Sequence, residues 1–413
     1  MELRERLRAL RTGSAPDQKP HVSHSPLPYL QPLENEHGCT YYSDKIYIDH
    51  HGRIDLKDFP SLSLEELQFL SMDRSLNEFS LRDAVFLDIE TTGTAGGTGT
   101  YAFLVGLGFV ESGYFQVRQY FLHDLSQEAA FLTALSGFIA RFAYIITYNG
   151  KCFDAQILRN RYLMHRREDP LEGKKHIDML FIARRLWKKR MRECDLMNLE
   201  RNILSFYRAD DIPGYLIPSA YTDYLRFARG NLIQKVLHHN QWDIVSLAVL
   251  TARACLLRSD TESLVPEEHL SLARLYERHR DYRQAVHHYM QSMNVSGPSS
   301  PALVALARNL RRVRDHDRMR WLVQQAEQLS MDPEICLRLS ILCEHDLREP
   351  ELALKFVDSQ ISRWERFRGL SSRGRRDIEA WKHRRDRLLR KITRRSGAES
   401  LIPVLVENCH ENS

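Results

Sequence analysis

The sequence has little that would mark a secreted, disulfide-linked or membrane-spanning protein. It has no apolar run long enough to span a bilayer, and residues 1–8 are charged throughout, whereas a signal peptide has an apolar centre. Its seven cysteines are scattered, odd in number and never arranged as Cys-x-x-Cys, so we expect neither a zinc site nor a disulfide framework. Together these absences predict a cytoplasmic protein.

Length and composition are those of a folded chain with several domains. The 413 residues leave room for two or three domains, and 43% hydrophobic and 27% charged residues are ordinary proportions. Five prolines fall within residues 12–38, which predicts a linker or extended arm. We therefore expect residues 1–83 to be an N-terminal arm and lead-in segment.

The most informative stretch is a short apolar run that leads into two acidic residues. Val-Phe-Leu precedes Asp88, Glu90 follows two positions later, and Thr-Thr-Gly ends the run. This pattern predicts a buried strand that stops at a turn. Side chains two apart on a strand share a face, so Asp88 and Glu90 would repel each other unless a cation lay between them. They are candidate ligands for Mg²⁺ or Mn²⁺, and the alternative is a solvated strand end.

The residues that follow predict an α/β fold. The glycine-rich residues 94–100 are not a phosphate-binding loop, because no Gly-Lys-Ser/Thr follows them. Hydrophobic periodicity then predicts two strands joined at residues 112–113, followed by helix, strand and helix, an order that suits a mixed sheet flanked by helices. The predicted strands are 101–110, 115–121 and 143–148, and the predicted helices are 128–142 and 154–165.

Asp154 is the next candidate ligand, because it lies just past a predicted strand at the start of a helix. Ligand sites in α/β sheets gather at strand ends, so Asp154 is placed to face Asp88 and Glu90. The alternative is an acid that is favoured at a helix start by the helix dipole. Asp178 precedes another predicted helix, and its expected role is the N-cap, with a position around the site as the alternative.

A helix predicted across residues 236–250 supplies the last candidates. His239 and Asp243 are four residues apart and share one face of this helix, whereas His238 lies on a different part of its surface. A lone histidine on a helix is usually structural. One that lies a turn before a metal-binding acid is suited to accept a proton, since an imidazole ordinarily titrates near neutral pH.

These motifs, in this order, resemble those of the DEDD exonuclease superfamily, which has a ribonuclease-H-like fold. Residues 86–93 resemble its first motif, residues 148–154 its second and residues 239–243 its third. The resemblance spans roughly residues 84–255, which we expect to form the exonuclease domain.

The finer resemblance is to the YprB-like branch of this superfamily. It rests on His-Ile-Asp at 176–178, Asp-Ile-Pro-Gly at 211–214 and the His-Asn pair that begins at His239. Members of the superfamily place a histidine five residues, or a tyrosine four residues, before the last aspartate, so His238 fits one spacing and His239 the other. We choose His239 as the general base, because the shared helix face and the His-Asn pair agree, and His238 is the alternative.

The resemblance implies a chemistry and a setting. Asp88, Glu90, Asp154 and Asp243 would hold two divalent cations, Mg²⁺ or Mn²⁺, and His239 would accept the proton of the attacking water. The implied activity is 3′→5′ exonuclease cleavage, with DNA favoured over RNA, in DNA repair beside a helicase partner. Two alternatives are a non-catalytic nucleic-acid-binding scaffold and a structure-specific endonuclease.

The C-terminal third has helical patterns only. Leu-Ala at 272–273, Tyr276, Ala285 and Tyr289 match a tetratricopeptide repeat, and related patterns recur 34 residues later and, more faintly, once again. We expect about three such repeats over residues 264–362, with a protein partner on their concave face. A helical bundle that only covers the nuclease domain is the alternative.

Residues 363–413 are expected to form a basic helical tail. Residues 363–395 hold fourteen Arg/Lys and four Asp/Glu, a net charge of +10 against +5 for the whole chain. Tryptophans at 364 and 381 and Phe367 lie among these charges. The pattern favours nucleic-acid contact through phosphate neutralisation and stacking, and a solvated terminal helix is the alternative.

Overall fold

In the computed structural model the chain divides into two compact units. The first comprises Met1–Leu62, Glu78–Met179 and Glu200–Thr251, and the second comprises Ser63–Asn77, Leu180–Leu199 and Ala252–Ser413. Residues 12–29 of the predicted arm, Phe367 and the end of the basic tail lie outside the described residues. The structure describes residues 30–43, 46–47, 50–51, 54–55, 65–76, 80–93, 99–228, 230–293, 300–327, 332–366 and 372–395.

The first unit is built on a mixed sheet, as the sequence predicts. The strand order is β1-β2-β8-β7-β6-β9-β10, and β3 also pairs with β8. Strands β1, β2, β8, β7 and β6 pair antiparallel, whereas β6, β9 and β10 run parallel. The bounds are β1 Leu30–Asn35, β2 Gly38–Ser43, β3 Ile46–Tyr47, β6 Ala84–Thr91, β7 Ala102–Glu111, β8 Tyr114–Phe121, β9 Tyr144–Thr147 and β10 Lys175–Asp178. A separate two-stranded sheet is formed by β4 (His50–His51) and β5 (Ile54–Asp55).

Strand β1 corrects the prediction of a linker across residues 12–38. Residues 30–35 pair with β2, and Leu30 is buried in the core of the first unit. Proline is tolerated in an edge strand, which is where Pro32 lies. The prolines therefore suggested a linker where an edge strand forms, because an edge strand does not need every backbone N–H to pair with a neighbour.

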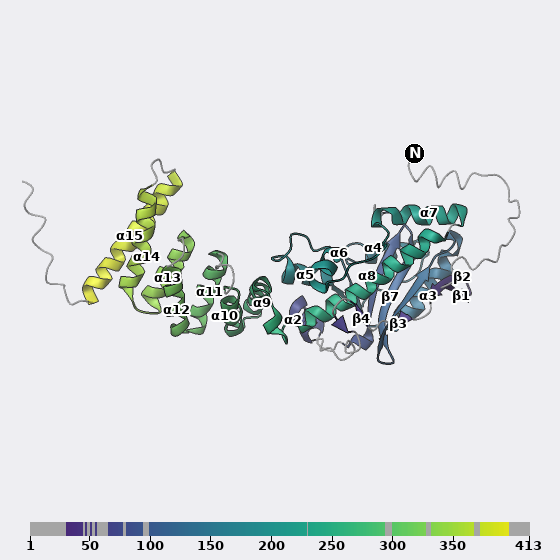
Figure 1. Cartoon of the computed structure of the whole chain (residues 1–413), viewed down its shortest axis with the longest axis horizontal. Helices are drawn as coiled ribbons and strands as arrows, with labels where there is room; N and C mark the ends of the chain where they lie inside the picture. The colour runs from purple at the N-terminus through teal and green to yellow at the C-terminus, as the bar shows by residue number, and fades with distance from the viewer. Residues whose placement is uncertain are drawn as a thin grey trace, which may run out of the picture. The chain divides into compact units, whose positions relative to one another are not determined.

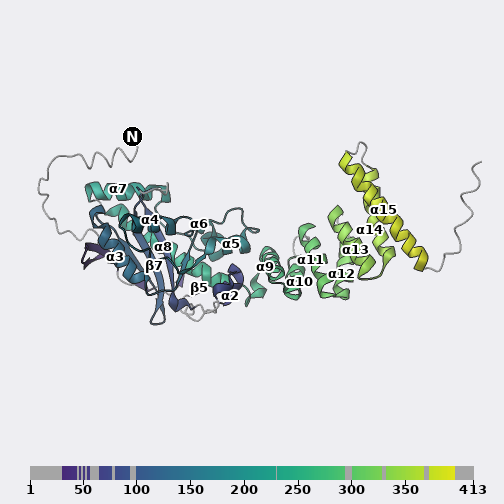
Figure 2. The same ribbon diagram turned by 180° about the vertical axis from the view of Figure 1, so that it is seen from behind.

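Helices cover the two faces of this sheet, as Figures 1 and 2 show from the front and from behind. Phe109 of β7 packs on Phe138 of α3 (Glu128–Ile139), with ring centroids 5.0 Å apart. Gly106 and Gly108 of β7 face α8 (Asn231–Leu256) on the other side, where a Cβ on Gly106 would lie 2.2 Å from Asn240. Successive side chains of a strand alternate between faces, so α3 and α8 cover opposite faces. The remaining helices of this unit include α4 (Asp154–Met164) and α7 (Ile217–Phe227).

The second unit is helical in its described residues. Helices α9, α11 and α13 begin at residues 266, 300 and 333, so successive pairs start 34 and 33 residues apart. Ala273 and Ala285 are fully buried where α9 and α10 meet. Their small side chains allow the two helices to pack closely. The helices are α2 Glu65–Ser71, α5 Met179–Trp187, α6 Leu196–Leu199, α9 Pro266–Arg278, α10 Tyr282–Gln291, α11 Ser300–Val313, α12 His316–Glu327, α13 Pro333–His345, α14 Pro350–Glu365 and α15 Ser372–Arg395.

None of the helices in the described parts of either unit combines the length and the apolar character needed to cross a bilayer.

Candidate active site

Strand β6 presents two acids to α8. Asp88 pairs with Gly106 of β7, and paired residues point to the same face, so Asp88 and Glu90 point toward the helix that Gly106 accommodates. Asn240 of α8 donates a hydrogen bond of 2.9 Å to Asp88 Oδ2, and its own Oδ1 accepts one of 2.9 Å from Gln119. The missing Cβ at Gly106 thus allows Asn240 to hold the first acid.

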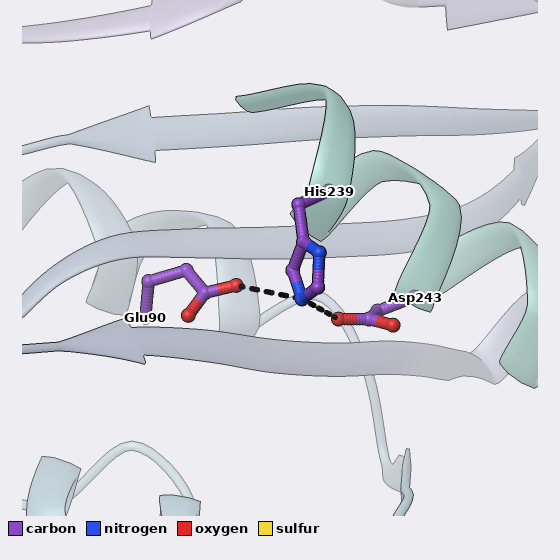
Figure 3. Close-up of side chains that lie close together, drawn as sticks. All are labelled: Glu90, His239 and Asp243. Carbon is purple, nitrogen blue, oxygen red and sulfur yellow. Dashed lines mark ion pairs between the residues drawn. The ribbon is translucent and has the colours of Figure 1, made fainter. Parts of the chain in front are cut away.

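Helix α8 contributes Asp243 and His239 to the same place. His239 Nε2 lies 3.3 Å from Asp243 Oδ2 and 4.0 Å from Glu90 Oε1, as Figure 3 shows. Each of the three residues offers one potential ligand atom, and these atoms all lie within 4.8 Å of one another. The spacing of four residues that suggested a shared helix face is therefore realised in the structure.

Asp154 is the first residue of α4, directly after the loop that leaves β9. This loop turns at Asn149, which has a φ of 62°, and at Gly150, where a Cβ would lie 2.5 Å from the Cβ of Thr147. Asp178 accepts hydrogen bonds from the backbone N–H groups of Asn149 (2.8 Å) and Lys151 (3.2 Å). Asp178 therefore fastens the loop that positions Asp154, a role beyond the helix cap that the sequence favours.

The pKa shifts of these acids show that they lie close enough to repel one another. Burial raises the pKa of Asp88 well above its ordinary range, and Asp243, Asp154 and Glu90 raise it further, whereas the hydrogen bond from Asn240 lowers it. Burial, and then the charges of Asp243 and Asp154, raise the pKa of Glu90. Burial, with the charges of Asp178 and Asp243, raises the pKa of Asp154 to about 8. All four acids predicted from the sequence thus act on one another electrostatically.

Arg208 is a site residue that its own sequence context did not reveal. Its guanidinium, only 4% exposed, donates hydrogen bonds to Asp243 Oδ1 and, at 2.6 Å, to Glu200 Oε1. Burial disfavours the charge on Arg208, yet Asp243 and Glu200 outweigh it and raise the pKa of the guanidinium. A basic residue in the connection before α7, with no regular structure predicted around it, gave no signal that it would reach α8.

Asp211 orients the histidine. Its Oδ1 lies 2.8 Å from His239 Nδ1, and its Oδ2 lies 3.3 Å from Arg208. Because an ionised carboxylate only accepts hydrogen bonds, His239 donates through Nδ1–H and leaves Nε2 to face Glu90 and Asp243. The Asp-Ile-Pro-Gly motif drew attention to Asp211, but only the fold gives it this partner.

His238, the alternative base, points elsewhere. Its side chain is exposed, and its ring lies 6.2 Å from that of Trp242. His239, in contrast, is only 12% exposed among the acids. The geometry therefore favours the residue that shares a helix face with Asp243.

The chemistry of these side chains fits a hard divalent cation. Carboxylate oxygens are the ligands that Mg²⁺ and Mn²⁺ prefer, and a cation would relieve the repulsion that raises the pKa values of three of these acids. Arg208 already neutralises part of the charge at Asp243. The remaining negative charge defines a possible metal site.

The family comparison agrees with this arrangement. Residues 85–255 match the family model of the RNase_H superfamily. With the mixed sheet and its helices, this match defines the region as a ribonuclease-H-like domain, a class whose activities are of the nuclease type and generally use divalent metals.

A curated relative matches beyond this domain. The chain is 30% identical over 259 residues to the uncharacterized protein YprB of Bacillus subtilis (strain 168). The alignment covers 62% of this chain and 59% of the length of that protein. The resemblance to YprB-like proteins seen in the motifs therefore extends to overall sequence similarity over part of both chains.

Proposed function

We propose that this protein is a DEDD-type exonuclease that hydrolyses DNA from the 3′ end with the help of two divalent cations, Mg²⁺ or Mn²⁺. The observations that carry the proposal are the mutual repulsion of the four buried acids Asp88, Glu90, Asp154 and Asp243, and the grouping of Glu90 and Asp243 with His239. Four acids in one place need cationic partners, and Arg208 alone does not supply them.

The residues divide the work between metal binding and proton transfer. The four acids would hold the cations, which would lower the pKa of the attacking water and stabilise charge on the leaving oxygen. His239 accepts the proton of that water through Nε2. Asp211 accepts the hydrogen bond of Nδ1–H and so orients the ring, and Asn240 fixes the carboxylate of Asp88 through a hydrogen bond to Oδ2.

The polarity, the preference for DNA and the setting in DNA repair rest on the resemblance to DEDD exonucleases. We also propose that α9 to α14 form tetratricopeptide-like repeats, supported by helix pairs that start 34 and 33 residues apart, and that they bind a protein partner such as a helicase. Cys39, Cys152, Cys255 and Cys336 are free thiols, which agrees with a proposed place in the reducing cytoplasm.

The test is digestion of 5′-labelled single-stranded DNA, double-stranded DNA and RNA by the full chain in Mg²⁺, Mn²⁺ or EDTA. The proposal expects products that shorten from the 3′ end, only with metal, and more rapidly on DNA. A circular single-stranded DNA should survive, because it has no 3′ end.

Two variants make the assay specific. Asp88→Asn should abolish digestion, whereas Asp83→Asn makes the same chemical change at an exposed aspartate just before β6 and should leave it intact. Cleavage of the circle would replace the exonuclease with an endonuclease. Absence of cleavage with every metal would overturn the proposal in favour of a binding scaffold.

A further inference from the structure

The helical unit carries a concave basic surface that the proposed nuclease chemistry does not use. A hollow of about 650 Å³ is lined by Arg311 of α11 and by Arg384 and Arg387 of α15. A second hollow of about 290 Å³ is lined by Arg311 again, by Arg308 and Arg312 of α11 and by Arg338 of α13. Because Arg311 lines both, the two hollows are neighbours, and together they are here called the basic groove. Its six arginines are Arg308, Arg311, Arg312, Arg338, Arg384 and Arg387.

Positive charge in the basic groove exceeds the negative charge that faces it. Asp346 pairs with Arg311 at 2.6 Å, and the buried Glu344 pairs with Arg384 at 3.0 Å and Arg387 at 2.6 Å. Glu334 lies 4.0 Å from Arg338. Six guanidinium groups thus meet three carboxylates, and the groove keeps a net charge of about +3.

The least neutralised arginines lie together on α11 and α13. Arg308 and Arg312 are four residues apart, so they share a helix face, and both are exposed. Neither forms an ion pair with a carboxylate of the described residues, although Arg312 lies 4.5 Å from the ring centroid of Tyr282. The Nε of Arg338 is buried, and it has no hydrogen-bond partner in the part of the chain that the structure describes. The exposed guanidinium groups of Arg308 and Arg312 are therefore available for an external anion, and Arg338, whose contact with Glu334 is long, lies beside them.

We propose that the basic groove binds the phosphate backbone of a nucleic-acid strand. Guanidinium groups match the geometry of phosphate oxygens and bind them with paired hydrogen bonds. A row of such groups along a concave surface suits a chain of regularly spaced anions. The choice of nucleic acid over an acidic protein rests on the proposed nuclease function, because a second contact for the same polymer raises its effective concentration at the first.

This assignment differs from the one that charge counting predicts. Counting placed the nucleic-acid contact across residues 363–395, but Arg384, Arg387 and Lys391 of α15 all pair with Glu344. Arg308 and Arg312 of α11, which lie outside that basic run, are less neutralised than these three residues. The groove is therefore a product of helix packing rather than of one basic segment.

The test measures binding of fluorescein-labelled oligothymidylate to the full chain by anisotropy in EDTA, where no metal-dependent digestion occurs. The groove variant carries Arg308→Gln, Arg312→Gln and Arg338→Gln. The control carries Arg283→Gln, Arg318→Gln and Arg320→Gln, which remove the same charge from exposed positions on α10 and α12. Circular dichroism and thermal unfolding establish that both variants are folded.

The groove variant should raise the dissociation constant roughly tenfold at moderate salt, and the control should stay close to the wild type. The slope of log affinity against log salt concentration should fall by about 2 in the groove variant, because each lost contact to single-stranded phosphate removes about 0.7. Equal losses in both variants, or none in either, would overturn the proposal. Displacement of the oligonucleotide by polyglutamate as readily as by unlabelled oligothymidylate would reassign the groove to an acidic protein.

Cleavage assays separate this proposal from the proposed nuclease activity. Groove-dependent binding without any metal-dependent cleavage would leave the groove assigned and reject the exonuclease. Cleavage with unchanged binding in the groove variant would do the reverse.

Discussion

A buried acid in the second unit and a group of buried acids in the first differ in how their charge is balanced. Glu344 of α13 is 1% exposed, and its carboxylate pairs with Arg384, Arg387 and Lys391. At the candidate active site the ratio of cations to carboxylates is reversed, because Arg208 forms ion pairs with Glu200, Asp211 and Asp243. Asp88, Glu90 and Asp154 have no ion pair with Lys or Arg among the described residues. A carboxylate with excess cations is structural, whereas a cluster with excess acids needs a cation from solution.

The sheet unit itself shows that the imbalance is local. Glu128 is 4% exposed and forms an ion pair with Arg161, and His165 Nε2 lies 2.8 Å from Glu128 Oε2, an oxygen that Arg161 also contacts. Arg161 also lies over the ring of Tyr101 at 3.8 Å. Buried acids in this unit are therefore neutralised where they only support the fold. The unbalanced group occurs where the end of β6, the start of α4 and the middle of α8 meet.

The largest expected effect is on DNA cleavage, after a substitution in the acid cluster of the candidate active site. Asp88→Asn removes one metal-binding charge with little change of shape, so cleavage of DNA should fall at least about a thousandfold, the consequence of losing several kcal/mol of metal stabilisation. Glu344→Gln removes a buried carboxylate that is already paired with cations. It should leave the cleavage rate near that of the wild type at a temperature where the variant is folded. Equal loss of activity in both variants would erase the distinction between the two groups.

The two neighbouring histidines should differ next most. His239→Ala removes the proposed proton acceptor and should lower kcat about a hundredfold with a smaller change in KM. His238→Ala removes an exposed ring and should retain nearly full activity. A reversed pattern would identify His238 as the base and would mean that the base does not share a helix face with Asp243.

For Glu344, whose charge is balanced by three cations, the expected effect of a substitution is on stability. Glu344→Gln leaves three cations without their carboxylate, and because Arg387 and Lys391 are 42% and 43% exposed they retain access to water. The free energy of unfolding should therefore fall by about 2 kcal/mol, less than for a fully enclosed pair. Urea denaturation of wild type and variant measures this, and an unchanged midpoint would mean that Glu344 contributes nothing to the fold.

The smallest expected effect is a pH dependence of the metal-free protein. Burial and neighbouring acids raise the pKa of Asp154 to about 8, above the value near 3.8 of an unfolded aspartate. A raised folded pKa favours folding below the unfolded pKa, and this contribution is lost as pH rises toward the folded pKa, with a slope of about 1.4 kcal/mol per pH unit for each proton held. Asp154→Asn should flatten the decline in stability measured in EDTA between about pH 5 and pH 7.5. A decline as steep in the variant as in the wild type would assign the effect to other groups.

Much of the sheet and the acids of the site could be predicted because their signals are local. The run that leads into Asp88 and Glu90 predicts a buried strand, and β6 covers it as Ala84–Thr91. The spacing of four residues between His239 and Asp243 predicts by itself that the two side chains share a helix face. The mixed sheet and the helical C-terminal region follow from periodicities of the same kind.

What the sequence could not reveal depends on contacts between distant residues. Arg208 meets Asp243, 35 residues away, and Asn240 meets Asp88, 152 residues away. Gly106 matters only because α8 crosses above it. No local pattern encodes such partners, since they exist only once the strands and α8 have packed. The same holds for the basic groove, which α11, α13 and α15 form together.

The most direct test of the account is the titration of Mn²⁺ into the metal-free full chain, followed by calorimetry, with Asp88→Asn, Asp154→Asn and Glu344→Gln alongside. The account predicts saturable binding in the wild type and in Glu344→Gln, and weak or no binding in the two site variants, because only the unbalanced acids need a cation. Equal binding by all four proteins, or no binding by the wild type, would contradict it.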